Sequence, residues 1–569
     1  MVREPVACVL LIASSVLAAE VNVERGVVMK TRDGVTLRAD VYRPKTDGKF
    51  PVLLQRTPYN KSGATDFGYR AAARGYVVIV QDTRGRYTSD GDFYPFKNES
   101  LDGYDAVEWA AALPYSNGKV GMFGGSYVGA TQMLAAIATP PHLAGVFAVV
   151  TASNYHDGWT YQGGAFEQWF NQSWTTGLVQ DTLDRRVRQS STALNWVWKL
   201  PLTTYPFLDL PAPSNLADYF LDWTRHPDFD EYWKQWSIED HYRNIRVPVY
   251  GVGGWYDIFQ GGTVRNYVGL KTQARGQRLM MGPWYHGPMN GQAGEVNFGP
   301  TAKGDPDIEM LRWYDHLLKG ASNGIEREKP VKIFVMGKNI WRDEDDWPLA
   351  RARSTRYYLH SGGNAATSSG DGTLSTAAPE TERADNYTYD PANPVPTRGG
   401  GLCCDNDRLP SGAFDQRAVE ERRDVLVFTT PAFTADFEVT GPIAVELYAA
   451  TSAIDTDFTA KLVDVWPNGF AQNLTDGILR ARYRNSHAQP ELMKPGEVYK
   501  LRIDLSNTSN VFLAGHKLRL EISNSNFPRF DRNLNTGEHA GQSGSMITAR
   551  NTVYHDAQHP SALILPVVP

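Results

Sequence analysis

The stretch from Lys119 to Ala130 constrains the fold most, because it joins a short apolar strand, a serine flanked by glycines and a helix-compatible run. Glycines permit a sharp turn between strand and helix, which would lift the hydroxyl of Ser126 clear of a sheet. At a helix N-terminus, unpaired N–H groups favour negative charge on an attacking oxygen. Short motifs also match by chance, so a glycine-rich connection with an exposed serine fits this stretch equally well.

Strands and helices alternate around this turn. A hairpin is expected first, because Asp33-Gly34 separates two apolar runs. Further strands are expected at 51–54, 76–80, 146–151, 247–252 and 277–281, and helices at 69–74, 102–113 and 307–318. This alternation predicts a parallel sheet covered by helices on both faces. Ligands bind such sheets beyond the carboxyl ends of the strands, where residues 56–60 and 82–86 are expected to lie.

Two later segments differ in character. Residues 154–242 are rich in tryptophan and predict a helical insertion, whose rings would form an apolar pocket or simply hold the insertion together. From Val331 onward, short runs of period two are separated by Gly, Pro, Asn and Asp, which predicts an all-β sandwich of jelly-roll type. Residues 361–398 are expected to form a long loop.

An acid and a base follow two of the later strands. Asp257 comes directly after one strand and His286 after the next. Each alone is more often structural, but the order Ser, Asp, His on an alternating α/β pattern is the one that an α/β-hydrolase triad requires. His286 would activate Ser126, and Asp257 would orient the imidazole. The N–H of Tyr127 would donate to the oxyanion, with a second donor from the loop after the strand at 51–55.

Several motifs resemble the cocaine esterase and X-Pro dipeptidyl-peptidase family of α/β-hydrolases, which also contains glutaryl-cephalosporin acylases and α-amino acid ester hydrolases. They are Arg56-Thr57-Pro58-Tyr59, Asp82-Thr83-Arg84-Gly85, Gly124-Gly125-Ser126-Tyr127, Gly254-Trp255-Tyr256-Asp257, Gly282-Pro283-Trp284-Tyr285-His286 and Ser525-Asn526-Phe527-Pro528-Arg529-Phe530. The resemblance implies that Ser126, Asp257 and His286 form the triad. It also implies that the Tyr59 hydroxyl joins the Tyr127 N–H in the oxyanion hole.

Together these patterns predict the domain order. We expect a signal peptide at 1–19, an α/β-hydrolase domain at 20–153 and 243–330, a helical cap at 154–242 and a C-terminal jelly-roll domain at 331–569. The substrate pocket is assigned to four aromatic residues, namely Trp159, Trp169, Trp255 and Phe259.

One departure from the family narrows the substrate. The α-amino acid ester hydrolases carry extra carboxylates shortly after the triad aspartate, whereas this chain has Ile258-Phe259-Gln260. Neutral side chains cannot pair with a substrate ammonium. Recognition of a free α-amino group is therefore disfavoured, although Asp157 or Glu167 of the cap could supply the charge instead.

The chain has 569 residues and a net charge of −6, so it gives no electrostatic case for nucleic acid or an anionic membrane as partner. An apolar run from Pro5 to Leu17, followed by Ala18-Ala19, indicates a signal peptide and a secreted or periplasmic protein. No later segment is long and apolar enough to span a bilayer. The sequence does not fix the oligomeric state, and a homodimer stays open.

The remaining cysteines, Cys403 and Cys404, are adjacent in the chain. They lack the further ligands of a zinc site. We expect buried or loop cysteines without chemistry, and keep a vicinal disulfide as the alternative. No metal or cofactor is expected.

The leading hypothesis is a serine hydrolase that cleaves an ester or amide of a small acyl substrate through an acyl-Ser126 intermediate. Within enzymes, the alternative is an X-Pro dipeptidyl-peptidase or an α-amino acid ester hydrolase. From another class, the alternative is a carbohydrate-binding or adhesive protein whose jelly roll is the active module.

Overall fold

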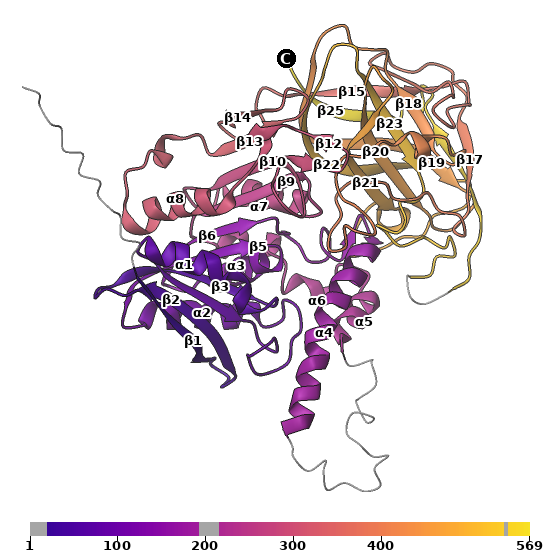
Figure 1. The fold of residues 1–569 in the computed structure, drawn as a ribbon. Helices are drawn as coiled ribbons and strands as arrows, with labels where there is room; N and C mark the ends of the chain where they lie inside the picture. The colour runs from indigo at the N-terminus through magenta and orange to yellow at the C-terminus, as the bar shows by residue number, and fades with distance from the viewer. Residues whose placement is uncertain (1–19, 193–215, 540–543) are drawn as a thin grey trace, which may run out of the picture.

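The computed structural model describes residues 20–192, 216–539 and 544–569. Figure 1 shows an α/β half in indigo to rose, a group of magenta helices at its side, and a β-rich C-terminal domain in orange and yellow. The expected signal peptide at 1–19 lies outside the described residues, as does part of the expected cap. Among the described helices, none combines the length and apolar character needed to cross a membrane.

The α/β half is built on a ten-stranded mixed sheet with the order β1-β2-β4-β3-β5-β6-β9-β10-β13-β14. Neighbours from β4 to β13 run parallel, whereas the outer pairs are antiparallel. The expected hairpin around Asp33-Gly34 joins β1 to β2. The bounds are β1 (Val21–Lys30), β2 (Thr36–Pro44), β3 (Phe50–Thr57), β4 (Val77–Asp82), β5 (Ser116–Gly125), β6 (Leu143–Val149), β9 (Val249–Tyr256), β10 (Arg278–Tyr285), β13 (Val331–Val335) and β14 (Ile340–Glu344).

Helices cover both faces of this sheet, as the alternation of strands and helices predicted. Neighbouring residues of β3 show it, because Val52 and Leu54 pack with α2 and α3 whereas Leu53 packs with α1 and α8. The helices are α1 (Thr65–Ala73), α2 (Glu99–Ala112), α3 (Tyr127–Ile137), α7 (Gln260–Leu270) and α8 (Pro306–Lys319), with short 3₁₀ turns η1 (Lys61–Ala64), η6 (Pro300–Ala302) and η7 (Ile325–Arg327).

The cap is helical where it is described, as expected. It contains the small hairpin β7 (Tyr161–Gln162) and β8 (Ala165–Phe166), then α4 (Gln168–Thr192), α5 (Asp218–Arg225), α6 (Glu231–Lys234) and η5 (Glu239–Asn244). Its rings form a dense cluster with the hydrolase half, in which five tryptophans are buried: Trp159, Trp174, Trp223, Trp233 and Trp236. Most of these rings therefore hold the cap together and seat it on the sheet.

The C-terminal domain is β-rich, with eleven strands in one hydrogen-bonded arrangement. Its strands are β15 (Arg353–His360), β16 (Thr373–Ser375), β17 (Asp385–Tyr389), β18 (Leu426–Thr429), β19 (Phe437–Thr451), β20 (Asp457–Val465), β21 (Ala471–Arg480), β22 (Tyr499–Phe512), β23 (Lys517–Ser523), β24 (Ala549–Tyr554) and β25 (Ala562–Val568). Its short elements are α9 (Arg417–Glu420) and η8 (Ala481–Tyr483), while the two-stranded pair β11 (Gln292–Ala293) and β12 (Val296–Asn297) follows β10 in the hydrolase half. The expected loop at 361–398 contains β16 and β17.

The observed sheet extends beyond the boundary that was expected at 330. Strand β13 pairs parallel to β10, and β14 pairs antiparallel to β13 at the sheet edge. These two strands were assigned to the jelly roll because they share its period of two, but an edge hairpin of a mixed sheet has the same period. One apolar cluster then continues from Met281 and Ile333 into the β-rich domain.

The two adjacent cysteines correct a prediction. Cys403 and Cys404 form a vicinal disulfide, whereas free cysteines without chemistry were expected. Cys403 is buried in the apolar cluster of the cap and the hydrolase half, and Cys404 is exposed with φ of 79°. The pairing depends on the conformation of one turn, which the composition of a short sequence does not specify.

Candidate active site

Ser126 occupies the turn between β5 and α3. Its φ and ψ are 60° and −127°, in a region that costs of the order of 1–3 kcal/mol and persists only where the surroundings impose it. Its N–H donates to the carbonyl of Val149 at 2.9 Å, and its carbonyl accepts from the Thr151 hydroxyl at 3.0 Å. A Cβ at Gly124 would lie 2.3 Å from Cγ1 of Val128, so the close strand–helix contact excludes a side chain there.

Tyr127 opens α3, so its backbone N–H is one of the first in the helix and has no partner within it. The ring is fully buried, and its hydroxyl donates to Glu99 at 3.1 Å. Glu99 also accepts from Arg56 at 2.7 Å. This buried chain fixes the start of the helix beneath Ser126, in keeping with the predicted oxyanion role of the Tyr127 amide.

Asp257 and His286 lie beyond the adjacent parallel strands β9 and β10, where the sequence placed them. Nδ1 of His286 lies 2.8 Å from Oδ2 of Asp257, and the other carboxylate oxygen accepts from the Phe259 N–H at 2.7 Å. The Asp257 side chain is fully buried, whereas that of His286 is 13 % exposed. The aspartate can thus hold the imidazole with Nε2 free to exchange a proton with a hydroxyl.

Tyr59 lies on the loop after β3. Its hydroxyl accepts from Nε1 of Trp174 at 2.8 Å. The residue is 40 % exposed, but many protein atoms surround the hydroxyl, and this desolvation raises its pKa to about 12. Hydrogen bonds with Trp174 and with the Ser126 side chain oppose that rise. Tyr59 is therefore a protonated donor beside the predicted nucleophile at neutral pH.

Of the predicted pocket residues, Phe259 and Trp159 lie together beside the histidine. Their rings stack with centroids 4.5 Å apart, and the rings of Phe259 and His286 lie nearly perpendicular with centroids 5.3 Å apart. Trp255 is directed elsewhere, because its indole donates to Phe334 and packs on Trp347 in the core toward the β-rich domain. Trp169 lies at the start of α4, where its backbone N–H donates to the Pro528 carbonyl of the β-rich domain.

The β-rich domain supports the turn that carries Asp257. Leu402 forms an isolated bridge with Asp257, and a Cβ at Gly401 would lie 3.1 Å from the Asp257 carbonyl oxygen. Gln260 is buried and donates through Nε2 to the Asn507 carbonyl, while its Oε1 accepts from the Ser506 hydroxyl. Gln260, in the turn after Asp257, is thus engaged with another domain. These contacts join residues that are far apart in the chain, and no sequence motif predicted them.

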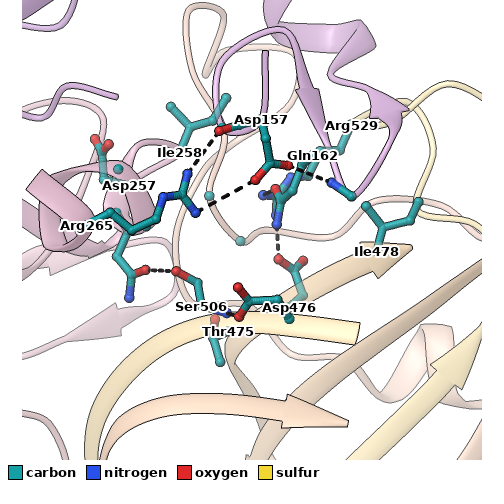
Figure 2. A pocket seen from close by; sticks show the side chains of 18 of the residues that line it. Asp157, Gln162, Asp257, Ile258, Arg265, Thr475, Asp476, Ile478, Ser506 and Arg529 are labelled. Atoms are coloured by element: carbon teal, nitrogen blue, oxygen red, sulfur yellow. Dashed lines mark hydrogen bonds and ion pairs between the residues drawn. The ribbon is translucent and has the colours of Figure 1, made fainter. Parts of the chain in front are cut away.

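A polar cavity of about 160 Å³ lies behind this turn, between the cap, α7 and the β-rich domain (Figure 2). Neither Ser126 nor His286 lines it. Asp157 lies in it opposite Arg265, which donates to the Asp157 backbone carbonyl at 3.0 Å and has an Nη atom 3.9 Å from the Asp157 carboxylate. Glu167, the other candidate for an ammonium, is buried 3.7 Å from Arg529. Both acids therefore already face a cation of the protein.

Comparisons with known proteins agree with this geometry. Residues 33–288 match the model of the X-Pro dipeptidyl-peptidase (S15 family), and residues 323–564 match that of the X-Pro dipeptidyl-peptidase C-terminal non-catalytic domain. Cocaine esterase of Rhodococcus sp. (strain MB1 Bresler) is 38 % identical over 570 residues, which cover 96 % of this chain and 99 % of that protein. The chain belongs to the cocaine esterase and X-Pro dipeptidyl-peptidase family. It is a serine hydrolase of the α/β-hydrolase fold.

Solved structures give the same fold. An aminopeptidase from a marine sediment Thaumarchaeota archaeon has a TM-score of 0.82 at 25 % identity, covering 100 % of this chain and 99 % of its own. An α-amino acid ester hydrolase has a TM-score of 0.80 at 25 % identity, covering 99 % and 98 %. The predicted architecture of an α/β-hydrolase domain, a cap and a β-rich C-terminal domain is thus confirmed.

Proposed function

We propose that this serine hydrolase cleaves esters of small aromatic or apolar carboxylic acids through an acyl-Ser126 intermediate. The observation that carries the proposal is the stacked pair Phe259 and Trp159, whose apolar surface meets the ring of His286 at 5.3 Å. Both side chains are buried, so the wall beside His286 is apolar and favours an apolar acyl group over a charged one. The name of the relative from Rhodococcus, cocaine esterase, supports ester chemistry.

The residues divide the reaction into two steps. His286 takes the proton of Ser126 as its oxygen attacks the ester carbonyl, and then gives that proton to the departing alcohol. Asp257 holds the imidazole in the required tautomer and stabilises its charged form. The Tyr59 O–H and the Tyr127 N–H donate to the tetrahedral oxyanion. Water then repeats the sequence on the acyl-enzyme and releases the acid.

Peptidase action on a free N-terminus is less favoured. Such a substrate needs an acceptor for its ammonium, and the carboxylates of the two cap acids that could serve, Asp157 and Glu167, face Arg265 and Arg529. Gln260, in the turn after Asp257, is bound to Ser506 and Asn507. A carboxylate already paired with a cation gains less from a second one.

The experiment compares kcat/KM for phenyl benzoate, phenyl acetate, phenylalanine phenyl ester and Ala-Pro-4-nitroanilide, each amine also as its N-acetyl derivative. We expect benzoate to be the best substrate and N-acetylation to change the rate less than threefold. Ser126→Ala is the control for background hydrolysis. A preference for the free amine of tenfold or more, or faster anilide than ester cleavage, contradicts the proposal.

We further propose that the protein is exported, either secreted or periplasmic. The apolar run before Ala18-Ala19 supports export, as does the Cys403–Cys404 disulfide, because disulfides persist mainly in oxidising compartments. Expression of the full chain in a bacterial host should yield a protein outside the cytoplasm whose N-terminal sequence begins near Glu20. A full-length product retained in the cytoplasm contradicts this proposal.

A further inference from the structure

One polar contact joins the cap to the oxyanion tyrosine. The indole Nε1 of Trp174, on α4, donates to the Tyr59 hydroxyl at 2.8 Å. Trp174 is buried, and its ring contacts those of Tyr127 and Trp159 at centroid distances of 5.7 Å. An indole N–H can only donate, so the direction of this hydrogen bond is fixed.

That direction determines where the tyrosine proton goes. A phenol has one proton and accepts through its oxygen, so accepting from Trp174 leaves the O–H of Tyr59 to another acceptor. The Ser126 side chain is the other hydrogen-bonding partner that influences the Tyr59 hydroxyl. Trp174 thus occupies an acceptor position of the Tyr59 oxygen and leaves the O–H to donate to an oxyanion, and a donor already oriented needs no reorganisation during the reaction.

A second link runs through Arg86, in the stretch after β4 that the sequence placed near the site. Arg86 is buried, donates through Nε to the Pro58 carbonyl at 2.9 Å, and donates through an Nη atom to the Leu178 carbonyl of α4 at 3.0 Å. One guanidinium therefore bridges the residue before Tyr59 and the helix that carries Trp174. Its positive charge also favours negative charge at the Tyr59 oxygen.

The loop around Tyr59 is held by the hydrolase half as well. The Tyr59 N–H donates to the Thr57 hydroxyl at 3.0 Å, and the Lys61 N–H donates to Asp82 at 2.7 Å. These bonds fix the backbone on either side. They do not involve the phenolic oxygen, which is bonded to the cap through Trp174.

We propose that Trp174 and Arg86 are positioning residues that make the Tyr59 oxyanion donor depend on cap helix α4. The inference rests on the proposed acyl-Ser126 chemistry, and extends it by assigning the cap a part in transition-state stabilisation. It does not depend on which acyl group the aromatic pocket prefers.

The test is a double-mutant cycle on kcat with phenyl acetate, whose acyl group is too small to report on the aromatic pocket. Trp174→Phe removes the indole N–H and should lower kcat about 5-fold, the value of one ordinary hydrogen bond, with KM changed less than threefold. In a Tyr59→Phe background the same substitution should change kcat less than twofold. Trp169→Phe, on the same helix α4, is the matched control, since it removes an indole whose N–H has no partner in the described structure. Its effect should be the same factor in both backgrounds.

Arg86→Lys is an independent test of the link between the Tyr59 loop and α4. Lysine keeps the positive charge but cannot form the bridge to two carbonyls that the guanidinium makes. We expect a fall in kcat that again disappears in the Tyr59→Phe background, with circular dichroism confirming the fold. Equal factors for Trp174→Phe in both backgrounds overturn the inference, as does an effect on KM alone. An unchanged kcat in Tyr59→Phe also overturns it, while leaving the acyl preference to be judged from the ester series.

Discussion

The two sides of the active site are supported by different parts of the molecule. On the proton-transfer side, the turn of Asp257 is backed by the β-rich domain, through the bridge to Leu402 and the bonds of Gln260 to Ser506 and Asn507. On the oxyanion side, Tyr59 is backed by the cap, through Trp174 and Arg86.

This difference indicates that the hydrolase sheet places the catalytic residues, but that their side chains are oriented by contacts with the other domains. The strand ends bring Ser126, Asp257 and His286 to one edge, as parallel topology dictates. Orientation within a fraction of an ångström then comes from neighbours that are remote in the chain. Substitutions on the two sides should therefore affect the reaction in distinguishable ways.

The largest effect is expected on the proton-transfer side. Asp257→Asn keeps the shape of the side chain but favours the wrong tautomer of His286, so kcat should fall by about 10⁴-fold with little change in KM. Steady-state kinetics with phenyl acetate measure this. Ser126→Ala defines the background rate. A loss of less than tenfold would remove Asp257 from the triad.

Tyr59→Phe should be the next largest, and it isolates the oxyanion side. Removing one oxyanion donor typically lowers kcat by about 10²–10³-fold. The pKa of Tyr59 is about 12, so the hydroxyl stays protonated and the ratio of the two enzymes' kcat values should be constant from pH 6 to 10. A ratio that collapses toward one at alkaline pH would show that the hydroxyl ionises in that range.

These two predictions concern residues that the sequence identified to different degrees. Ser126, Asp257 and His286 each follow a recognisable apolar strand, so local patterns sufficed to propose them. Tyr59 followed only from family resemblance, because a tyrosine in a loop has no periodic signal. Trp174 went unrecognised as its partner, since the two residues are 115 positions apart and come from different domains.

The fold shows the same limit. Strand and helix positions were predictable because period and turn residues are local, and the hairpin at Asp33-Gly34 is an example. The assignment of β13 was not, because its pairing with β10 depends on which sheet has an open edge. The Cys403–Cys404 disulfide likewise depends on a local turn that apolar patterning does not encode.

A smaller effect is expected where the β-rich domain meets the Asp257 turn. Gln260→Ala leaves the Asn507 carbonyl and the Ser506 hydroxyl without their buried partner, which costs about 1–3 kcal/mol. We expect a lower Tm and a fall in kcat smaller than that of Tyr59→Phe. Thermal unfolding and kinetics on the same preparation check this, with Gln273→Ala, at a partly exposed site on the same half, as the control. An unchanged Tm would show that the contacts of Gln260 do not stabilise the turn and would contradict the prediction.

The smallest effect is a change in pH dependence at the contact between the cap and the β-rich domain. Burial raises the pKa of Glu167 from its ordinary 4.5 to about 7, although Arg529 opposes the rise. The folded state thus holds this proton more tightly than the unfolded chain. Its contribution to stability is complete below pH 4.5 and is lost as pH rises through 7. The Tm advantage of the natural protein over Glu167→Gln should accordingly shrink between pH 5 and 8, as measured by calorimetry. A difference in Tm between the two proteins that does not change with pH would contradict the raised pKa of Glu167.

The apolar cluster that runs from β10 and β13 into the β-rich domain has a consequence for protein engineering. Because Met281, Ile333 and residues of the distant strands share one buried interior, exchanging the C-terminal module between relatives would cut through a packed core rather than a linker. Chimaeras joined at a loop after β14 should fold only if the side chains that face each other across this cluster come from the same parent protein. The C-terminal module and the catalytic sheet are therefore packed as one unit.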